Sequence, residues 1–179
     1  MMLDKFETAR RLGAARLPHP QTMLGSDIEK WDTFPAIAKP RSGRGSRDVY
    51  LVKSAEHFLN YLAFTEQAPD DVVLQEYVIG QEYTVMMAAD DKANLRAVVP
   101  VRVDIKRGIT IRAITEASEV LLNSCQAIHC VLPARGCYNI QAIFDHQGRV
   151  LPFEINPRVS TTLCVGIAAG VDPFSIYLG

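Results

Sequence analysis

Two side chains near the end of the chain have the chemistry and the spacing to bind a divalent cation. Glu154 and Asn156 stand two residues apart in the run Leu151–Pro157. On an extended strand, residues two apart point to the same face, so the carboxylate and the amide project together. Both offer hard oxygen ligands, which Mg²⁺ prefers when it also holds phosphate oxygens. The alternative is that the two residues only cap turns at the end of a strand.

A hairpin would bring a third oxygen ligand to the same face. Two strand-like runs, Asn139–Phe144 and Arg149–Ile155, are separated by the turn-forming tetrapeptide Asp-His-Gln-Gly. A four-residue loop would pair Phe144 with Arg149, and Gln141 would then lie on the face that carries the carboxylate and the amide. Three oxygen-bearing side chains would converge there.

A lysine followed by a glycine-rich loop is the second place where the sequence indicates chemistry. Lys39 follows a compact apolar strand, Phe34–Ala38, and the loop Arg41–Ser46 contains only arginine, serine and glycine. Gly43 and Gly45 let backbone N–H groups approach an anion closely, and the lysine adds a positive charge at the base of the loop. The loop has neither the Walker spacing nor Gly-x-Gly-x-x-Gly. A flexible surface turn is the alternative.

The segment Gln75–Tyr83 indicates a boundary between two sheets that can bind a nucleoside. A strand that ends at Gly80 before another strand begins is typical of a hinge. Backbone groups there can bond to the edge of an adenine, and a nearby carboxylate, from Glu76 or Glu82, can accept hydrogen bonds from ribose hydroxyls. The alternative is that both glutamates are solvated strand ends.

The composition is that of an ordinary globular protein. Of the 179 residues 48% are hydrophobic and 22% are charged, and the net charge of −1 does not indicate a general nucleic-acid or membrane-surface binder. The length favours one domain with a sizeable core. The start of the chain lacks an apolar signal run, and no stretch approaches the ~18 apolar residues of a membrane span, so we expect a cytoplasmic protein. Four cysteines without Cys-x-x-Cys spacing are expected to be reduced: Cys125, Cys130, Cys137 and Cys164.

The hydrophobic periodicity predicts an α+β protein with two small sheets and a cleft between them. Helices are expected at Asp4–Leu17, at Ser54–Thr65 with the serine as N-cap, and at Thr115–Cys130. Strands are expected at Phe34–Ala38, Val49–Val52, Val72–Val78, Glu82–Ala89 and Leu95–Val103, followed by the hairpin already described.

Taken in order, four motifs resemble those of an ATP-grasp domain, and the resemblance spans nearly the whole chain. They are Lys39-Pro40 with its glycine-rich loop, Gln75-Glu76-Tyr77 followed by Gly80-x-Glu82, Asn139-Ile140-Gln141, and Glu154-Ile155-Asn156-Pro157-Arg158. The closest resemblance is to the large subunit of carbamoyl-phosphate synthase. It includes the run Asn156–Ser160 and the opening Asp4-Lys5-Phe6.

The resemblance implies an ATP-grasp fold in which two α+β subdomains grip ATP, and a reaction that passes through an acylphosphate. It assigns the phosphates to Lys5, Lys39, Gly43, Arg44, Gly45 and Ser46, the adenine to Glu76, Tyr77 and Val78, and the ribose to Glu82. It assigns one or two Mg²⁺ (or Mn²⁺) ions to Gln141, Glu154 and Asn156, and the transferred phosphoryl group or acylphosphate to Arg158. Phosphoryl transfer mainly needs positioning and neutralisation of charge, which a metal and cations supply.

Two departures from that family pattern affect the expected substrate and organisation. Gly108-Ile109-Thr110 stands where the synthase type carries a histidine, so a different carboxylate substrate is expected. Lys106 and Arg112 lie nearby and would either face that acid or form a solvated basic strand. The N-terminal α/β domain that usually precedes such a region does not occur in this sequence, so we expect a missing domain or a partner subunit.

These features together predict one ATP-grasp domain over residues 1–179. It would consist of a lead-in at residues 1–34, a small lid-like subdomain at 35–78 and a larger metal and substrate subdomain at 79–179. The predicted activity is that of an ATP-dependent ligase for a small-molecule carboxylate and an amine-type acceptor, with neither nucleic acid nor membrane as a partner. The alternatives are a split ATP-binding module that is incomplete alone, and an interaction domain that does not bind nucleotide.

Overall fold

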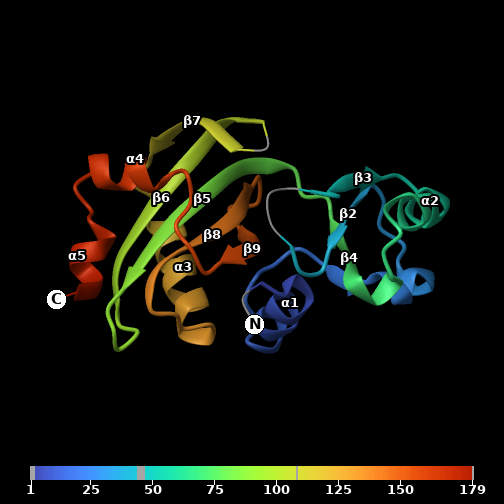
Figure 1. The fold of residues 1–179 in the computed structure, drawn as a ribbon, viewed down its shortest axis with the longest axis horizontal. Helices are drawn as coiled ribbons and strands as arrows, with labels where there is room; N and C mark the ends of the chain where they lie inside the picture. Colours follow the sequence, from blue (N-terminus) through green and yellow to red (C-terminus); the bar gives the residue numbers. More distant parts are fainter. Residues whose placement is uncertain (1–2, 44–46, 108, 179) are drawn as a thin grey trace.

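Two antiparallel sheets organise the structure, a computed structural model that describes residues 3–43, 47–107 and 109–178 (Figure 1). Within these ranges one sheet has four strands and the other has five. We call the parts built on them the small lobe and the large lobe. The predicted α+β class with two sheets is confirmed. No helix in the described ranges has both the length and the apolar character needed to span a bilayer.

The small lobe packs one helix, α2 (Ala55–Thr65), against four short strands. These are β1 (Thr22–Leu24), β2 (Ala36–Pro40), β3 (Tyr50–Val52) and β4 (Val72–Glu76), in the order β1–β4–β2–β3, with 3₁₀ turns at Gly25–Lys30 and Pro69–Asp71. The Ser54 side chain accepts a hydrogen bond from the His57 backbone N–H at 3.1 Å, which confirms the predicted N-cap. Phe58 and Tyr61, three residues apart on one face of α2, are buried in the core of the lobe.

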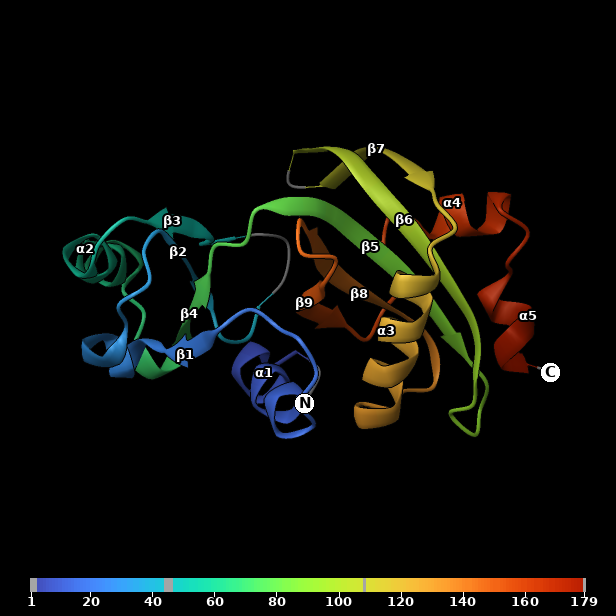
Figure 2. The ribbon, with the colours of Figure 1, turned by 180° about the vertical axis from the view of Figure 1, so that it is seen from behind.

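The large lobe is a five-stranded sheet with helices on both faces (Figures 1 and 2). Its strands are β5 (Gly80–Ala89), β6 (Leu95–Arg107), β7 (Ile109–Thr115), β8 (Gly136–Asp145) and β9 (Val150–Asn156), in the order β7–β6–β5–β8–β9. Helices α1 (Lys5–Ala14) and α3 (Glu119–Val131) cover one face, and α4 (Leu163–Ala168) and α5 (Pro173–Leu178) cover the other.

Strand β5 lies at the centre of the large sheet, so both of its faces are buried. Val85 and Met87 pack with Leu12 of α1 and Leu121 of α3. Met86, on the opposite face, packs in a separate cluster that includes the start of α4. The strand therefore reads as a continuous apolar run rather than an alternating one.

Three elements of the large lobe were not among the predicted helices and strands: β7, α4 and α5. The predicted start of the helix α3 at Thr115 is wrong, because β7 continues through that residue. The helix begins after Ser118, whose hydroxyl accepts a hydrogen bond from the Leu121 N–H at 3.4 Å. A local cap, rather than the apolar period, sets the boundary.

The predicted hairpin between β8 and β9 forms, but the predicted register is wrong. Phe144 pairs with Val150 rather than Arg149. The Asp145 carboxylate accepts hydrogen bonds from the backbone N–H groups of the turn and of Arg149, which closes a tighter loop than expected. A β-bulge at Phe153 then shifts the pairing by one more residue.

The chain crosses between the lobes twice, in residues 15–21 and 77–79, and hydrogen bonds join the two crossings. The Gln21 N–H donates to the Glu76 carboxylate at 3.1 Å, and the Glu76 N–H donates to the Gln21 carbonyl oxygen at 2.9 Å. Strand β1 lies in the small sheet, although the sequence division assigned it to the lead-in. That division into residues 1–34, 35–78 and 79–179 stays a prediction.

Candidate functional site

Two adjoining pockets lie between the lobes and receive residues from both. The first, which we call the charged pocket, is lined by seven residues that carry its chemistry: Lys5, Lys39, Arg47, Lys106, Gln141, Phe153 and Glu154. The second, the apolar pocket, is lined by Glu76, Tyr77, Val78, Glu82, Ile143 and, again, Phe153. Because Lys39, Lys106 and Phe153 border both, the two pockets form one continuous site.

Lys39 is a buried cation in the wall between the pockets. Its ammonium, at the end of β2, donates hydrogen bonds to Gln75 Oε1 at 2.7 Å and to the Phe153 carbonyl oxygen at 3.3 Å. Burial lowers the pKa of Lys39 to about 7; Glu154 opposes this shift, and the positive charges of Lys5 and Lys106 add to it. An anion entering the charged pocket would restore the charge on this lysine.

The first turn of α1 delivers a second cation to the charged pocket. The ammonium of Lys5 lies 3.6 Å from Glu154 Oε1, and its side chain is only 7% exposed. Since the carboxylate belongs to β9, this pair joins α1 to the large sheet beside the place where Lys39 enters. The sequence predicted both lysines as phosphate contacts, and the structure places both in one pocket.

The three predicted metal ligands lie on one face of the β8–β9 hairpin. Gln141 is paired directly with Glu154, and the next pair on that face joins Asn139 to Asn156. Asn139 was not among the predicted site residues, although its position two residues before Gln141 on the same strand was a signal for it. It is buried, and its amide nitrogen donates to the Arg158 carbonyl oxygen at 2.9 Å.

One atom of this group has no hydrogen-bond partner among the residues that the structure describes. The side-chain carbonyl oxygen of Asn156 is buried without one, while the amide nitrogen of the same side chain donates to Asn139 Oδ1 at 3.5 Å. A buried, unpaired acceptor costs free energy unless a ligand satisfies it. Within the described residues no cluster of three His, Cys, Asp or Glu side chains could hold a metal ion. The predicted ligands Gln141, Glu154 and Asn156 instead offer one carboxylate and two amides. Carboxylate and amide oxygens are suitable ligands for an Mg²⁺ ion that is also coordinated by phosphate oxygens.

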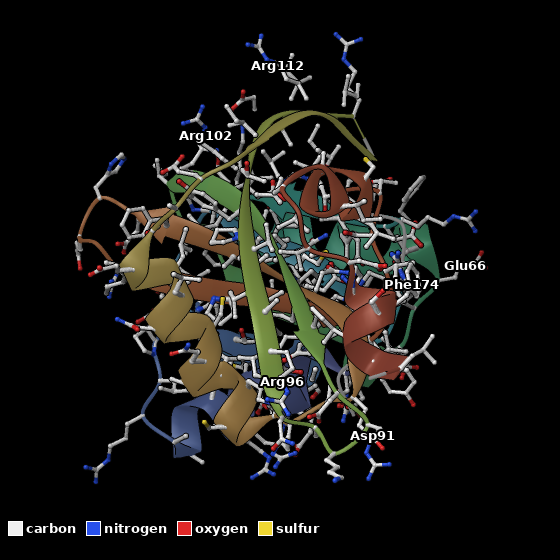
Figure 3. The ribbon with its side chains drawn as sticks, turned by 90° about the vertical axis from the view of Figure 1, so that its left-hand side faces the viewer. Glu66, Asp91, Arg96, Arg102, Arg112 and Phe174 are labelled. Carbon is white, nitrogen blue, oxygen red and sulfur yellow. The ribbon has the colours of Figure 1, made fainter. Side chains whose placement is uncertain are left out.

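Glu82, predicted to bind the ribose, forms an ion pair across the apolar pocket. Lys106 of β6 donates to its carboxylate and lies 5.9 Å from the centre of the Phe153 ring. Lys106 therefore belongs to the site, whereas Arg112 does not. Its side chain is 73% exposed, lies 3.6 Å from Asp104 and points outward at the β7 end of the sheet (Figure 3).

The remaining predicted residues fall in different places. Tyr77 and Val78 line the apolar pocket at the crossing between the lobes, as does Glu76, whose carboxylate is bonded to the other crossing. Gly43 lines the charged pocket. Arg158 lies just after β9, and its guanidinium donates to the Val159 carbonyl oxygen at 3.1 Å. Three predicted loop residues lie outside the described residues: Arg44, Gly45 and Ser46.

Comparison with known proteins bears on the identity of this site. A family model described as "ATP-grasp in the biosynthetic pathway with Ter operon" matches residues 68–178. The D-alanine–D-alanine ligase of Chromohalobacter salexigens is 23% identical over 177 residues, which cover 86% of this chain and 54% of that protein. The chain thus spans about half the length of the curated relative that it matches.

Solved structures share the fold at low sequence identity. The L-amino acid ligase of Bacillus licheniformis has a TM-score of 0.77 and 14% identity, with 99% of this chain and 46% of that chain covered. The biotin carboxylase domain of the 2-oxoglutarate carboxylase of Hydrogenobacter thermophilus, solved with MgADP and bicarbonate, has a TM-score of 0.74 and 16% identity, over 96% and 43% of the two chains.

Proposed function

Because the chain belongs to the ATP-grasp family, we propose that it binds ATP between its two lobes and uses it to activate a carboxylate. The γ-phosphoryl group would pass from ATP to a carboxylate oxygen, with ADP as the leaving group. The nitrogen of an amine-type acceptor would then attack the carbonyl carbon of the acylphosphate, forming a C–N bond as phosphate leaves. The observation that carries the proposal is the charged pocket, in which three lysines, an arginine, a carboxylate and an amide converge from both lobes and α1.

The apolar pocket is the proposed adenosine site. Tyr77 and Val78 lie where the chain crosses between the lobes, with the apolar side chains of Ile143 and Phe153 opposite. An adenine ring needs such apolar walls and backbone groups at its edge. Glu82 would accept hydrogen bonds from the ribose hydroxyls, at the carboxylate that also accepts from Lys106.

The charged pocket is the proposed phosphate site. Lys5 and Lys39 would neutralise the phosphates, and Gly43 lies where the loop that contains Arg44, Gly45 and Ser46 begins. These loop residues and Arg158 are assigned from the sequence resemblance, the arginine as the group that stabilises charge on the transferred phosphoryl. Positioned cations act in this way because they stabilise charge that develops during transfer.

Gln141, Glu154 and Asn156 would hold Mg²⁺, or Mn²⁺ in its place. The ion would neutralise the phosphate oxygens during transfer. The unpaired Asn156 oxygen and the pairing of Gln141 with Glu154 support this assignment. When no metal ion is bound, the ammonium of Lys5 neutralises the charge of the Glu154 carboxylate.

The finer features of the activity also remain proposals. A small-molecule carboxylate and an amine-type acceptor agree with the relatives named as ligases of amino acids. The likeness to carbamoyl-phosphate synthase rests on the sequence motifs alone. Four cysteine thiols that are free in the structure agree with a reducing compartment such as the cytoplasm.

A second candidate is an ATP-binding module whose turnover needs a further domain or partner subunit. The observation that favours it is coverage, because this chain accounts for 54% of the curated ligase. Both candidates require nucleotide binding between the lobes, and only the first requires turnover by this chain alone.

Release of ADP from MgATP, measured with a panel of small carboxylates and amines, tests the proposal. Turnover that needs both a carboxylate and an amine supports the ligase. Binding of ATP without carboxylate-dependent ADP release supports the module, and the absence of ATP binding contradicts both. Glu154→Gln provides the matched inactive control for contaminating ATPases.

A further inference from the structure

The N-terminal end of α1 contacts the small lobe through a two-pronged ion pair. The Arg41 guanidinium, just after β2, donates from Nη2 to Asp4 Oδ2 at 2.8 Å and from Nε to both carboxylate oxygens at 3.0 and 3.1 Å. The Lys5 backbone N–H donates to the Arg41 carbonyl oxygen at 3.0 Å. This bond satisfies one of the free N–H groups at the start of the helix.

The helix α1 is itself fixed to the large lobe. Leu12 of α1 is fully buried in the core of the large lobe. The ammonium of Lys5 lies 3.6 Å from Glu154 on β9. The pair between Asp4 and Arg41 therefore joins the two lobes, at the border of the charged pocket rather than at the chain crossings.

We propose that Asp4 and Arg41 are positioning residues, whose ion pair holds the end of β2 against α1 so that Lys39 and Lys5 face the same phosphates. The inference rests on the proposed function. Lys39 lies two residues before Arg41, and Lys5 follows Asp4 directly, so the pair fixes the spacing of two cations that come from different lobes. Neither residue of the pair lines either pocket as the structure describes them.

The geometry favours a positioning role over a role in stability. The side chains of Arg41 and Asp4 are 34% and 23% exposed. Ion pairs at such partly exposed sites contribute little to folding, whereas the planar guanidinium fork defines distance and direction. Removing the pair should therefore change the relation between the lobes and leave each lobe folded.

Two variants and their combination test this role. The Asp4 side chain is also the N-cap of α1 and accepts a hydrogen bond from the Glu7 N–H at 3.0 Å. Asp4→Asn removes the charge but keeps a side chain that caps helices as well as aspartate does. Arg41→Gln removes the other partner. Because the two residues act as one unit, we expect each single variant and the double variant to weaken ATP binding by a similar factor, about three- to tenfold, with adenosine affinity unchanged.

The helix α1 itself offers a matched control. Arg10 pairs with Glu7 at 2.8 Å, but both residues belong to α1 and the pair does not reach the small lobe. Arg10→Gln should leave the affinity for ATP and for adenosine unchanged. Calorimetry with both ligands on the full chain supplies the comparison, and thermal unfolding shows that every variant is folded.

Amide hydrogen exchange tests the contact between the lobes without nucleotide. The Lys5 N–H, bonded across the lobes, should exchange faster in Asp4→Asn, while the Arg41 N–H, bonded to Asp71 within the small lobe, should be unchanged. Unchanged Lys5 exchange overturns the proposal, and so does an equal loss of affinity for ATP and adenosine. If the wild-type protein bound no ATP, the proposed function would fail, and the Lys5 exchange would still decide whether the pair joins the lobes.

Discussion

Lys39, on the small lobe, donates a hydrogen bond to the backbone carbonyl of Phe153, on the large lobe, at 3.3 Å. The same ammonium lies 5.2 Å from the centre of the Phe153 ring. A bulge in β9 exposes this carbonyl, because Phe153 has no partner on β8. One lysine thus contacts both proposed parts of the nucleotide site.

Lys39→Ala is expected to weaken ATP binding more than adenosine binding. The variant removes a close cation from a partly desolvated phosphate contact, which costs about 2 kcal/mol, or tenfold and more in affinity. Calorimetry with ATP and with adenosine measures the two losses separately. Equal losses would mean that Lys39 supports the fold rather than the phosphates.

The buried charge of Lys39 also predicts how stability depends on pH. Its pKa falls from 10.5 to about 7 on folding, so between these values the unfolded chain holds a proton that the folded chain lacks. The contribution of Lys39 to the free energy of unfolding therefore rises with pH across this window. The stability of wild type minus that of Lys39→Met, measured by denaturant unfolding from pH 6 to pH 10, should increase. The exposed Lys53→Met serves as control, and a flat difference for Lys39 would contradict the shift.

Glu154→Ala should abolish Mg²⁺-dependent turnover and leave the fold intact. The carboxylate supplies all of the ligand charge in the proposed set with Gln141 and Asn156, and a metal that bridges phosphates depends on that charge. ADP release measured against Mg²⁺ concentration gives the result. Asp91→Asn, which removes an exposed carboxylate at the far turn of the large sheet (Figure 3), is the control. Wild-type ADP release by the Glu154 variant would end the metal assignment.

Lys106→Met should change adenosine and ATP binding in opposite directions. Lys106 occupies one oxygen of the Glu82 carboxylate, so its removal frees that oxygen for the ribose and strengthens adenosine binding. It also removes a cation from the charged pocket, which weakens ATP binding. Titrations with 2′-deoxyadenosine and adenosine show whether the gain needs the ribose hydroxyl. A loss for both adenosine and ATP would contradict the exchange of partners.

Local patterns predicted much of the fold and the shared face of three candidate ligands. The N-cap at Ser54 needed only short-range chemistry. Gln141 falls on the face of Glu154 and Asn156 even with the wrong hairpin register, because the predicted pairing with Pro152 lies two residues from the observed one with Glu154. A period of two preserves the face when the register slips by two.

Contacts between distant segments could not be predicted from local patterns. Lys106 meets Glu82 only through the pairing of two long strands, and Arg41 meets Asp4 only once the lobes are assembled. Neither pair has a spacing that a helix or strand period would reveal. Their partners depend on tertiary register, which the sequence motifs of the family do not specify.

The hydrogen bonds between Gln21 and Glu76 bear on how the lobes can move. The two connections between the lobes lie side by side there, so these bonds form a hinge about which the lobes can rotate once the contact between Asp4 and Arg41 opens. Rotation about this hinge would open and close the site, so nucleotide entry and product release would cross the same barrier. Substitutions of Gln21, which lines neither pocket, should therefore alter the rates of ligand exchange in both directions while leaving equilibrium affinity nearly constant, a kinetic signature distinct from that of a pocket residue such as Glu76.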